Sequence, residues 1–220
     1  RRQRQMCIRD SMWMIKPVDF DPENKYPLLM FQYSGPGSQQ VSNRWGDYRT
    51  LWHKDLANQG YIIACVDGRG TGFKGSKFKK STYLNLVKYE SIDQIGVARA
   101  LGELPFIDKK RIGIWGWSFG GHMAAHCLLT GGGIFSFAIA VAPVTNWRFY
   151  DTIYTERFMR TPQENPEGYD LNSPLNYADQ LNGNFLIIHG SGDDNVHVQN
   201  TMRMVDALIQ ADKQFDWMIY

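Results

Sequence analysis

Short apolar runs alternate along this chain with stretches in which apolar residues recur at helical spacing. The runs are rich in aromatic and β-branched residues, which is typical of buried strands. They predict strands at Met12–Pro17, Tyr26–Tyr33, Tyr61–Val66, Ile112–Trp115, Phe135–Val144, Phe185–His189 and Phe215–Tyr220. The spaced stretches predict helices at Asp47–Asn58, at Lys88–Leu104, from just after Ser118 to Thr130, and at Val196–Ala211. This alternation predicts an α/β fold with a mostly parallel central sheet and helices on both faces.

The chain between Trp147 and Asn182 departs from this pattern. It begins with an aromatic and charged run, continues as a polar stretch, and shows poor periodicity of either kind. The sequence therefore predicts no regular element there.

The sharpest local pattern is Gly116-Trp117-Ser118-Phe119-Gly120, which lies between a predicted strand and a predicted helix. In this context G-x-S-x-G indicates a nucleophile elbow, the strained turn that presents the catalytic serine of an α/β-hydrolase fold. Side chains at either glycine would collide with the neighbouring strand and helix. Ser118 would also lie at a helix N-terminus, where free backbone N–H groups stabilise a developing negative charge. We therefore predict that Ser118 is a nucleophile rather than an incidental turn residue.

A serine hydroxyl becomes a good nucleophile only when a base takes its proton and a third group holds that base. On this fold the expected chain order is serine, then a carboxylate, then histidine. Asp193 follows a predicted buried strand directly, at the sheet edge where such sites form. We predict that Asp193 is the carboxylate and that Asp194 has a structural role. The alternative is that both aspartates cap the helix expected to begin near Val196.

The base is harder to find among the histidines, which are His53, His122, His126, His189 and His197. His53 falls on a predicted surface helix, and His189 and His197 flank Asp193 without a separate loop that could reach Ser118. His122 and His126 lie four residues apart on one helix, which is a spacing used by metal-binding pairs. The glutamate of H-E-x-x-H is missing, however, so the sequence favours helix packing for both.

The length of 220 residues suits one large domain or two small ones, and the apolar residues are plentiful enough for a sizeable core. No run approaches the roughly 20 apolar residues that span a bilayer. Residues 1–11 look different from the rest: they are arginine-rich, aperiodic, and resemble translated sequencing-adapter sequence. We expect them to be non-native and residues 12–220 to form the domain. Without the net charge of +3 in residues 1–11, the remaining chain has a net charge of −1. The charge therefore gives no support to a nucleic-acid or membrane partner.

Several longer stretches together resemble the catalytic domain of the prolyl oligopeptidase family of serine peptidases, and most closely its dipeptidyl peptidase IV branch. The resemblance runs from Met12 to Tyr220. It is carried by Tyr26-Pro27-Leu28-Leu29, Tyr33-Ser34-Gly35-Pro36, Asp67-Gly68-Arg69-Gly70, Trp115-Gly116-Trp117-Ser118-Phe119-Gly120-Gly121, Val141-Ala142-Pro143-Val144 with Trp147, Tyr150-Asp151, Tyr154-Thr155-Glu156-Arg157, and His189-Gly190 with Asp193-Asp194-Asn195-Val196-His197.

The resemblance implies a serine exopeptidase that releases N-terminal dipeptides after proline or alanine through an acyl-enzyme, without metal or cofactor. Its substrate would be a peptide with proline at the second position. Ser118 matches the nucleophile, Asp193 the triad carboxylate, and Asn195 an amide that holds a substrate carbonyl. The Tyr33 hydroxyl and the Phe119 backbone N–H match the oxyanion hole. The residues that match an apolar pocket for the proline ring are Val144, Trp147, Tyr150, Tyr154 and Val196.

Two parts of the family pattern are not found in this sequence. In the family, the catalytic histidine follows the carboxylate that matches Asp193 by roughly thirty residues, which places it past Tyr220. It is the last of the three triad residues in the order serine, carboxylate, histidine. The family's β-propeller, which grips the substrate's amino terminus with an acidic pair, is also missing. We therefore expect a truncated catalytic domain that is inactive by itself. The resemblance further implies that the longer protein is exported or surface-bound and forms homodimers.

Three other interpretations stay open at this point. Gly70-x-Gly72-x-x-Gly75 fits a nucleotide-binding pattern, but it is not followed by a predicted helix. Another serine hydrolase of the same fold, such as an acylaminoacyl-peptidase or an esterase, would share the elbow. A binding homologue that has lost the base would also share it.

Overall fold

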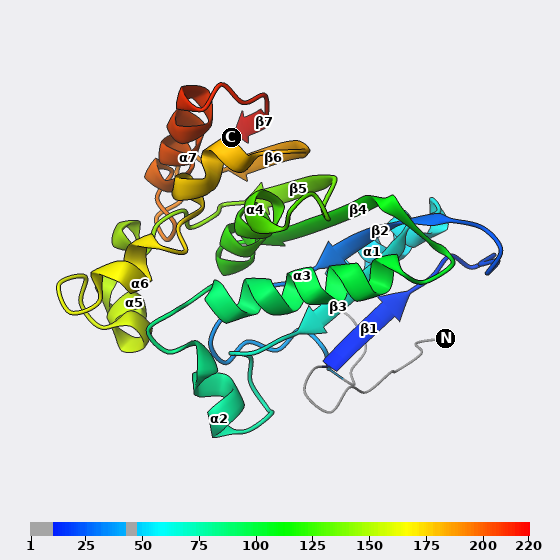
Figure 1. The fold of residues 1–220 in the computed structure, drawn as a ribbon, viewed down its shortest axis with the longest axis horizontal. Coiled ribbons are helices and arrows are strands. Elements are labelled where there is room, and N and C mark those ends of the chain that lie inside the picture. Colours follow the sequence, from blue (N-terminus) through cyan, green and yellow to red (C-terminus); the bar gives the residue numbers. More distant parts are fainter. Residues whose placement is uncertain (1–10, 43–47) are drawn as a thin grey trace.

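The structure is a computed structural model that describes residues 11–42 and 48–220 (Figure 1). The strands of this part of the chain form one sheet in the order β1-β3-β2-β4-β5-β6-β7. Their bounds are β1 (Ser11–Ile15), β2 (Tyr26–Phe31), β3 (Ile62–Asp67), β4 (Ile107–Trp117), β5 (Phe137–Val141), β6 (Asn184–His189) and β7 (Asp216–Ile219). Strand β1 is antiparallel to β3, and every other pairing is parallel. The predicted mostly parallel sheet is therefore confirmed.

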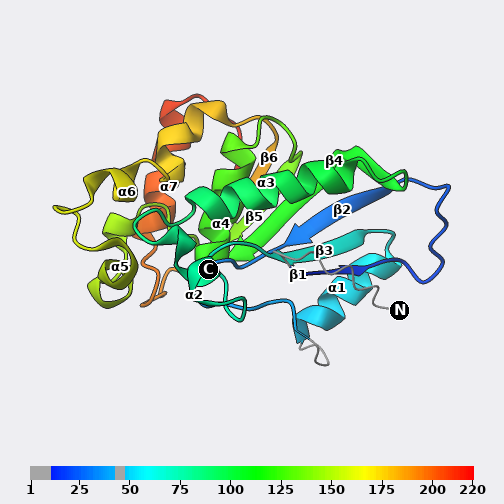
Figure 2. The ribbon, with the colours of Figure 1, turned by 60° about the horizontal axis from the view of Figure 1, so that its bottom comes forward.

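Helices cover both faces of this sheet. They are α1 (Tyr48–Asn58), α2 (Ser76–Lys79), α3 (Lys88–Gly102), α4 (Phe119–Thr130), α5 (Thr152–Met159), α6 (Pro166–Asp170) and α7 (Gln199–Gln210), with 3₁₀ turns η1 (Lys80–Thr82), η2 (Trp147–Phe149) and η3 (Pro174–Gln180). Figure 2 shows α3 and α4 on one face and α1 on the other. None of these helices is long and apolar enough to cross a lipid bilayer.

Alternation along the strands supplies an apolar cluster to each face, because successive side chains of a strand point to opposite sides. On β2, Leu28 and Met30 belong to a large cluster that also holds residues of α3 and α4. Leu29 and Phe31 belong to a smaller cluster on the side of α1. The period of two in the sequence thus becomes two buried layers around one sheet.

The segment from Trp147 to Asn182 contains four short helical elements, contrary to the prediction of no regular structure. Local capping explains the difference. The Asp151 carboxylate accepts a hydrogen bond from the Tyr154 amide at 2.7 Å, and the Asn165 side chain accepts one from the Gly168 amide at 3.2 Å. Helices this short are stabilised by their caps and tertiary contacts rather than by a repeating apolar face. In Figures 1 and 2, α5 and α6 lie beyond the carboxyl ends of the parallel strands.

The structure bears on three smaller expectations. Helix α1 lies at the surface as predicted, but the His53 side chain is on its buried side, 1% exposed, with its ring centroid 5.1 Å from that of Phe31. Helix α7 begins at Gln199 rather than near Val196. Residues 1–10 and Asp47 lie outside the described residues, while Ser11, assigned to the non-native segment, pairs with Asp67 as the first residue of β1.

Candidate active site

Ser118 lies between β4 and α4 in a backbone conformation that L-residues rarely adopt. Its φ is 55° and its ψ is −120°, and its side chain is partly exposed. The Ser118 amide donates a hydrogen bond to the Val141 carbonyl at 2.9 Å, which holds the turn against the end of β5. A non-glycine residue kept at positive φ by its surroundings is typical of a functional turn. The geometry is that of a nucleophile elbow.

Backbone crowding explains the glycines on either side of Ser118. A Cβ atom at Gly116 would lie 2.6 Å from the Gln32 carbonyl oxygen and 2.7 Å from the Gly120 carbonyl oxygen. A Cβ atom at Gly120 would lie 2.7 Å from the same Gln32 oxygen. Both neighbours are backbone atoms that cannot move aside, so strand β2 and helix α4 fit together only because these positions lack side chains.

Gln32 also ties the elbow to β2 through its side chain. This fully buried residue donates a hydrogen bond from Nε2 to the Gly120 carbonyl at 2.7 Å, and its Oε1 accepts one from the Ser34 hydroxyl at 3.2 Å. Sequence reasoning missed Gln32, because a single glutamine at the end of an apolar run carries no pattern of its own. We assign it to positioning the turn that carries Ser118.

Asp193 lies in the loop after β6, on the same edge of the sheet as Ser118. Strand β5 separates β4 from β6, so the ends of these two strands are about 10 Å apart at the usual strand spacing. The Asp193 Oδ1 accepts hydrogen bonds from the Asn195 and Val196 amides at 3.0 and 2.9 Å. Neither bond caps α7, whose N-cap is Val198 and has no side-chain hydrogen bond. The carboxylate instead closes its own loop.

His189 is hydrogen-bonded to the loop that carries Asp193. Its Nε2 donates to the Val196 carbonyl at 2.7 Å and lies 3.6 Å from the Asp193 Oδ2, while its Nδ1 accepts from the Thr201 hydroxyl at 2.7 Å. With both nitrogens bonded and the side chain fully buried, His189 is not placed to take a proton from Ser118. Thr201 is a second supporting residue that the sequence did not indicate.

Burial on α4 also keeps His122 and His126 from serving as the base. His122 and His126 are buried on α4, and burial lowers the pKa of His122 to about 4 and that of His126 to about 3. The His122 Nε2 donates to the Asn172 carbonyl at 2.9 Å, which supports the predicted packing role over a metal pair. Within the described residues no group of three or more His, Cys, Asp or Glu side chains could hold a metal ion. His197 is exposed, and His53 lies in the aromatic cluster under α1.

The aromatic residues expected to form the proline pocket come together beside the elbow. The rings of Trp147 and Tyr154 are stacked with centroids 6.0 Å apart, and Tyr150 meets Tyr154 edge-on at 5.4 Å. Phe119, next to Ser118, contacts Trp147 at 5.3 Å. Trp147 itself is 2% exposed, and Val144 and Val196 are equally buried in the main core. Three of the five predicted pocket residues are therefore part of the core, while Tyr150 and Tyr154 are partly accessible.

Asn195 and Tyr33 complete this group from two other loops. The Tyr150 hydroxyl donates to the Asn195 Oδ1 at 2.8 Å. The centroid of the Tyr33 ring lies 6.5 Å from that of Phe119 and 5.3 Å from that of Trp117. Tyr33 therefore packs against the residues directly before and directly after Ser118. Burial raises the pKa of the Tyr154 phenol, and the nearby Tyr33 adds to the rise. A phenol with a raised pKa stays neutral at pH 7 and can donate a hydrogen bond.

Asn200, on α7, is hydrogen-bonded to both ends of the segment Thr145–Phe149, which carries the predicted pocket residue Trp147. This fully buried amide accepts a hydrogen bond from the Thr145 amide at 2.9 Å and donates to the Phe149 carbonyl at 3.3 Å. Because these two bonds bracket Trp147, the pocket wall and α7 are held as one unit. Sequence reasoning missed Asn200, since its partners are more than fifty residues away.

Glu90 is a buried carboxyl group at the start of α3. It is 1% exposed on the first turn of α3, and burial raises its pKa to about 8. A Cβ atom at Gly70 would lie 3.4 Å from its Oε1, so the loop after β3 covers it. Its charge also contributes to the raised pKa of Tyr154.

We predict that Glu90→Gln becomes progressively more stable than the unchanged chain as pH rises from 5 to 8. The folded state keeps a proton up to about pH 8, whereas the unfolded carboxyl loses it near its ordinary value of 4.5. The folded protein therefore binds more protons in this window, and the contribution of Glu90 to stability falls as pH rises through it. The expected gain at pH 8 relative to pH 5 is roughly 3 kcal/mol. Urea unfolding at both pH values measures it. Glu103→Gln, at the exposed end of the same helix, should show no such trend. Equal pH trends in the two variants would contradict the prediction.

The comparisons with known proteins agree with this geometry. The profile described as "Prolyl oligopeptidase family" matches residues 48–220. The chain is 49% identical over 210 residues to a probable dipeptidyl-aminopeptidase B of Coccidioides posadasii (strain C735), covering 93% of this chain and 22% of that protein. It is 50% identical over 197 residues to a probable dipeptidyl-aminopeptidase B of Arthroderma benhamiae, covering 88% of this chain and 21% of that protein. The chain therefore spans about a fifth of the length of these curated relatives.

Solved structures give the same match in three dimensions. The crystal structure of Porphyromonas gingivalis dipeptidyl peptidase 4 superposes with a TM-score of 0.95 at 52% identity, covering 100% of this chain and 32% of that one. A putative dipeptidyl aminopeptidase IV from Bacteroides ovatus gives 0.93 at 39% identity, covering 96% and 30%. The predicted α/β-hydrolase fold is confirmed by these matches, and the chain is a homologue of dipeptidyl peptidases. Since the family profile matches most of its residues, this chain belongs to the prolyl oligopeptidase family.

Proposed function

We propose that the longer protein, meaning the product of the complete gene that contains this chain, is a serine exopeptidase. It releases N-terminal dipeptides after proline or alanine through an acyl-enzyme. The observation that carries the proposal is the aromatic group of Trp147, Tyr150 and Tyr154, which adjoins the strained Ser118 turn through Phe119. Flat aromatic walls suit proline, because its ring is rigid and it has no N–H to satisfy.

In the proposed mechanism the Ser118 hydroxyl attacks the carbonyl carbon of the proline residue. The Phe119 amide at the start of α4 and the Tyr33 hydroxyl donate hydrogen bonds to the oxyanion. The Asn195 amide holds a carbonyl of the substrate. Collapse of the tetrahedral intermediate breaks the peptide bond after proline, and the amine of the remaining peptide leaves with the proton that the base took from Ser118. The dipeptidyl group is then bound as an ester of Ser118, and water hydrolyses this ester in a second step to release the dipeptide and restore the hydroxyl.

We propose that Asp193 orients a histidine that lies outside these 220 residues. The carboxylate would accept the Nδ1 proton of that histidine and fix the tautomer that takes a proton from Ser118. Four of the five histidines in this chain are buried. The Nε2 of His122 and both ring nitrogens of His189 are already hydrogen-bonded. The nucleotide sequence that follows the codon for Tyr220 tests this directly, because a histidine is expected there in a loop. A complete gene with no downstream histidine would support the dead-homologue interpretation.

A substrate panel tests the function itself. The longer protein should hydrolyse Ala-Pro-p-nitroanilide with a kcat/KM about 100-fold above that for Ala-Leu-p-nitroanilide, since the pocket discriminates mainly by shape and apolar contact. Ala-Ala-p-nitroanilide should fall between the two. An N-acetylated Ala-Pro substrate, an acylated amino-acid anilide and p-nitrophenyl acetate are the controls. Faster hydrolysis of the acylated amino acid or the ester would assign the protein to another class of serine hydrolase.

A further inference from the structure

A cavity of about 700 Å³ lies beside the aromatic group, between α2 and η1 on one side and α5 on the other. Lys79, Lys80 and Arg157 line it, and no carboxylate does. In the described part of the chain, ion pairs join Arg69, Arg111 and Arg148 to carboxylates, but none involves these three cations. The cavity therefore presents an uncompensated positive charge.

The loop that begins at Tyr33 leads from the elbow into this cavity. A Cβ atom at Gly35 would lie 3.2 Å from the Phe119 ring, so the loop packs on the residue next to Ser118. Pro36 lines the cavity, and a Cβ atom at Gly37 would lie 3.2 Å from the Lys79 Cε. One short stretch of backbone thus connects the serine turn with a lysine of the cavity.

Helix α5 makes a second connection. Phe158 lines the cavity, and its ring meets the ring of Tyr154 edge-on at 5.0 Å. Arg157 precedes it on the same helix. The cavity and the aromatic group therefore share a wall, which Phe158 and Tyr154 form between them.

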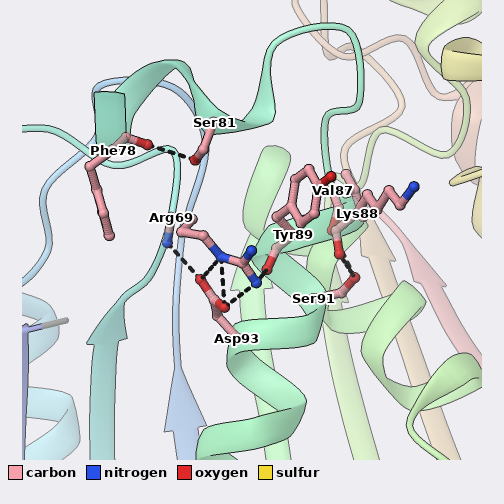
Figure 3. A network of polar contacts seen from close by, with 8 residues as sticks. All are labelled: Arg69, Phe78, Ser81, Val87, Lys88, Tyr89, Ser91 and Asp93. Atoms are coloured by element: carbon pink, nitrogen blue, oxygen red, sulfur yellow. Dashed lines mark hydrogen bonds and ion pairs between the residues drawn. The ribbon is translucent and has the colours of Figure 1, made fainter. Parts of the chain in front are cut away.

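The walls of the cavity are held in place by backbone and side-chain hydrogen bonds. The Leu84 amide donates to the Phe158 carbonyl at 2.9 Å, which joins the segment after η1 to the end of α5. The Ser81 hydroxyl donates to the Phe78 carbonyl at 2.7 Å and so fixes the turn that carries Lys79 and Lys80 (Figure 3). Nearby, Figure 3 shows the Arg69 guanidinium paired with the Asp93 carboxylate, which braces the loop after β3 against α3.

We propose that this cavity is a subsite for a carboxylate on a substrate residue that flanks the scissile proline. The proposal rests on the proposed function, because it requires the proline to occupy the aromatic pocket. Lys79, Lys80 and Arg157 are exposed, so water and salt screen their charges, but three cations with no carboxylate in the same lining still attract the carboxylate of a substrate. The preferred substrates are then peptides with Asp or Glu directly before or directly after that proline.

Matched pairs of substrates test the proposal in the longer protein. Glu-Pro-p-nitroanilide against Gln-Pro-p-nitroanilide examines the position before proline. The peptides Ala-Pro-Glu-Ala and Ala-Pro-Gln-Ala, followed by chromatography, examine the position after it. In one of the pairs the acidic substrate should have a kcat/KM at least about threefold higher at low salt, a size typical of partly exposed ion pairs. The preference should shrink between about 20 and 500 mM NaCl as the Debye length falls.

Charge-removing variants assign the preference to the cavity. Lys79→Met, Lys80→Met and Arg157→Met should each lower the acidic-to-amide ratio toward one while leaving Ala-Pro-p-nitroanilide hydrolysis within about twofold of the unchanged enzyme. Lys77→Met removes the same charge from α2 outside the cavity lining and should leave the ratio unchanged. Ratios near one in both pairs, or a ratio that none of the three cavity variants lowers, would overturn the subsite. Absence of Ala-Pro-p-nitroanilide hydrolysis would instead overturn the proposed function.

Discussion

Asp193→Asn is expected to lower the kcat of the longer protein for Ala-Pro-p-nitroanilide by about 10,000-fold, with a much smaller change in KM. The Asp193 Oδ1 accepts the Asn195 and Val196 amides, and an asparagine oxygen can keep both bonds, so the loop should retain its shape. What the variant loses is the negative charge that, in the proposed mechanism, fixes the tautomer of the base and stabilises its protonated form. Steady-state kinetics with the purified longer protein measures the effect.

Asp194→Asn is the matched control for this experiment. Asp194 is adjacent in sequence and exposed, and we assign it no part in the reaction. Its kcat should stay within about threefold of the unchanged enzyme, as for most surface substitutions. Comparable losses in the two variants would show that the loop matters for its net charge or shape, and the triad assignment of Asp193 would then be wrong.

Gly116→Ala is expected to destabilise the 220-residue chain by at least about 3 kcal/mol, because overpacking against fixed backbone must displace an element. The added methyl group would meet two backbone carbonyl oxygens, those of Gln32 and Gly120, at 2.6 and 2.7 Å. Relief requires β2 and α4 to separate, and this movement would also shift Ser118. Urea unfolding monitored by tryptophan fluorescence measures the loss.

Gly96→Ala makes the same chemical change where there is room for it. Gly96 is exposed within α3, and a Cβ atom there would meet nothing within 4 Å. Alanine should stabilise the chain by up to about 1 kcal/mol through its higher helix propensity. If Gly116→Ala cost no more than a few tenths of a kcal/mol, the elbow would be looser than its contacts indicate.

The sheet, its helices and the serine turn could be predicted because each has a local signature. The β-rich runs mark the strands, and the glycines around Ser118 mark a backbone approach that only glycine permits. Asp193 could be proposed for a similar reason, since loops after parallel strands meet at one sheet edge. In these cases the information lies within a few residues of the feature.

The remaining features depend on partners that are distant in sequence. Gln32 bonds to Gly120, and Asn200 bonds to Thr145 and Phe149, so neither position is distinctive until the fold brings its partners near. Glu90 reads as an ordinary first-turn acid of a helix, yet it is buried. Tertiary packing determines the burial and the partners of such residues, and a single sequence does not show which residues will be packed together.

The central claim is that Ser118 becomes a covalent nucleophile in the longer protein, and covalent labelling tests it most directly. A dipeptidyl phosphonate ester with proline at its reactive position should modify the longer protein once, and peptide mass spectrometry should place the adduct on Ser118. The 220-residue chain should react far more slowly, because its base is proposed to lie outside it. An adduct on a different residue, or turnover of Ala-Pro-p-nitroanilide by an enzyme in which Ser118 is replaced by alanine, would contradict the account.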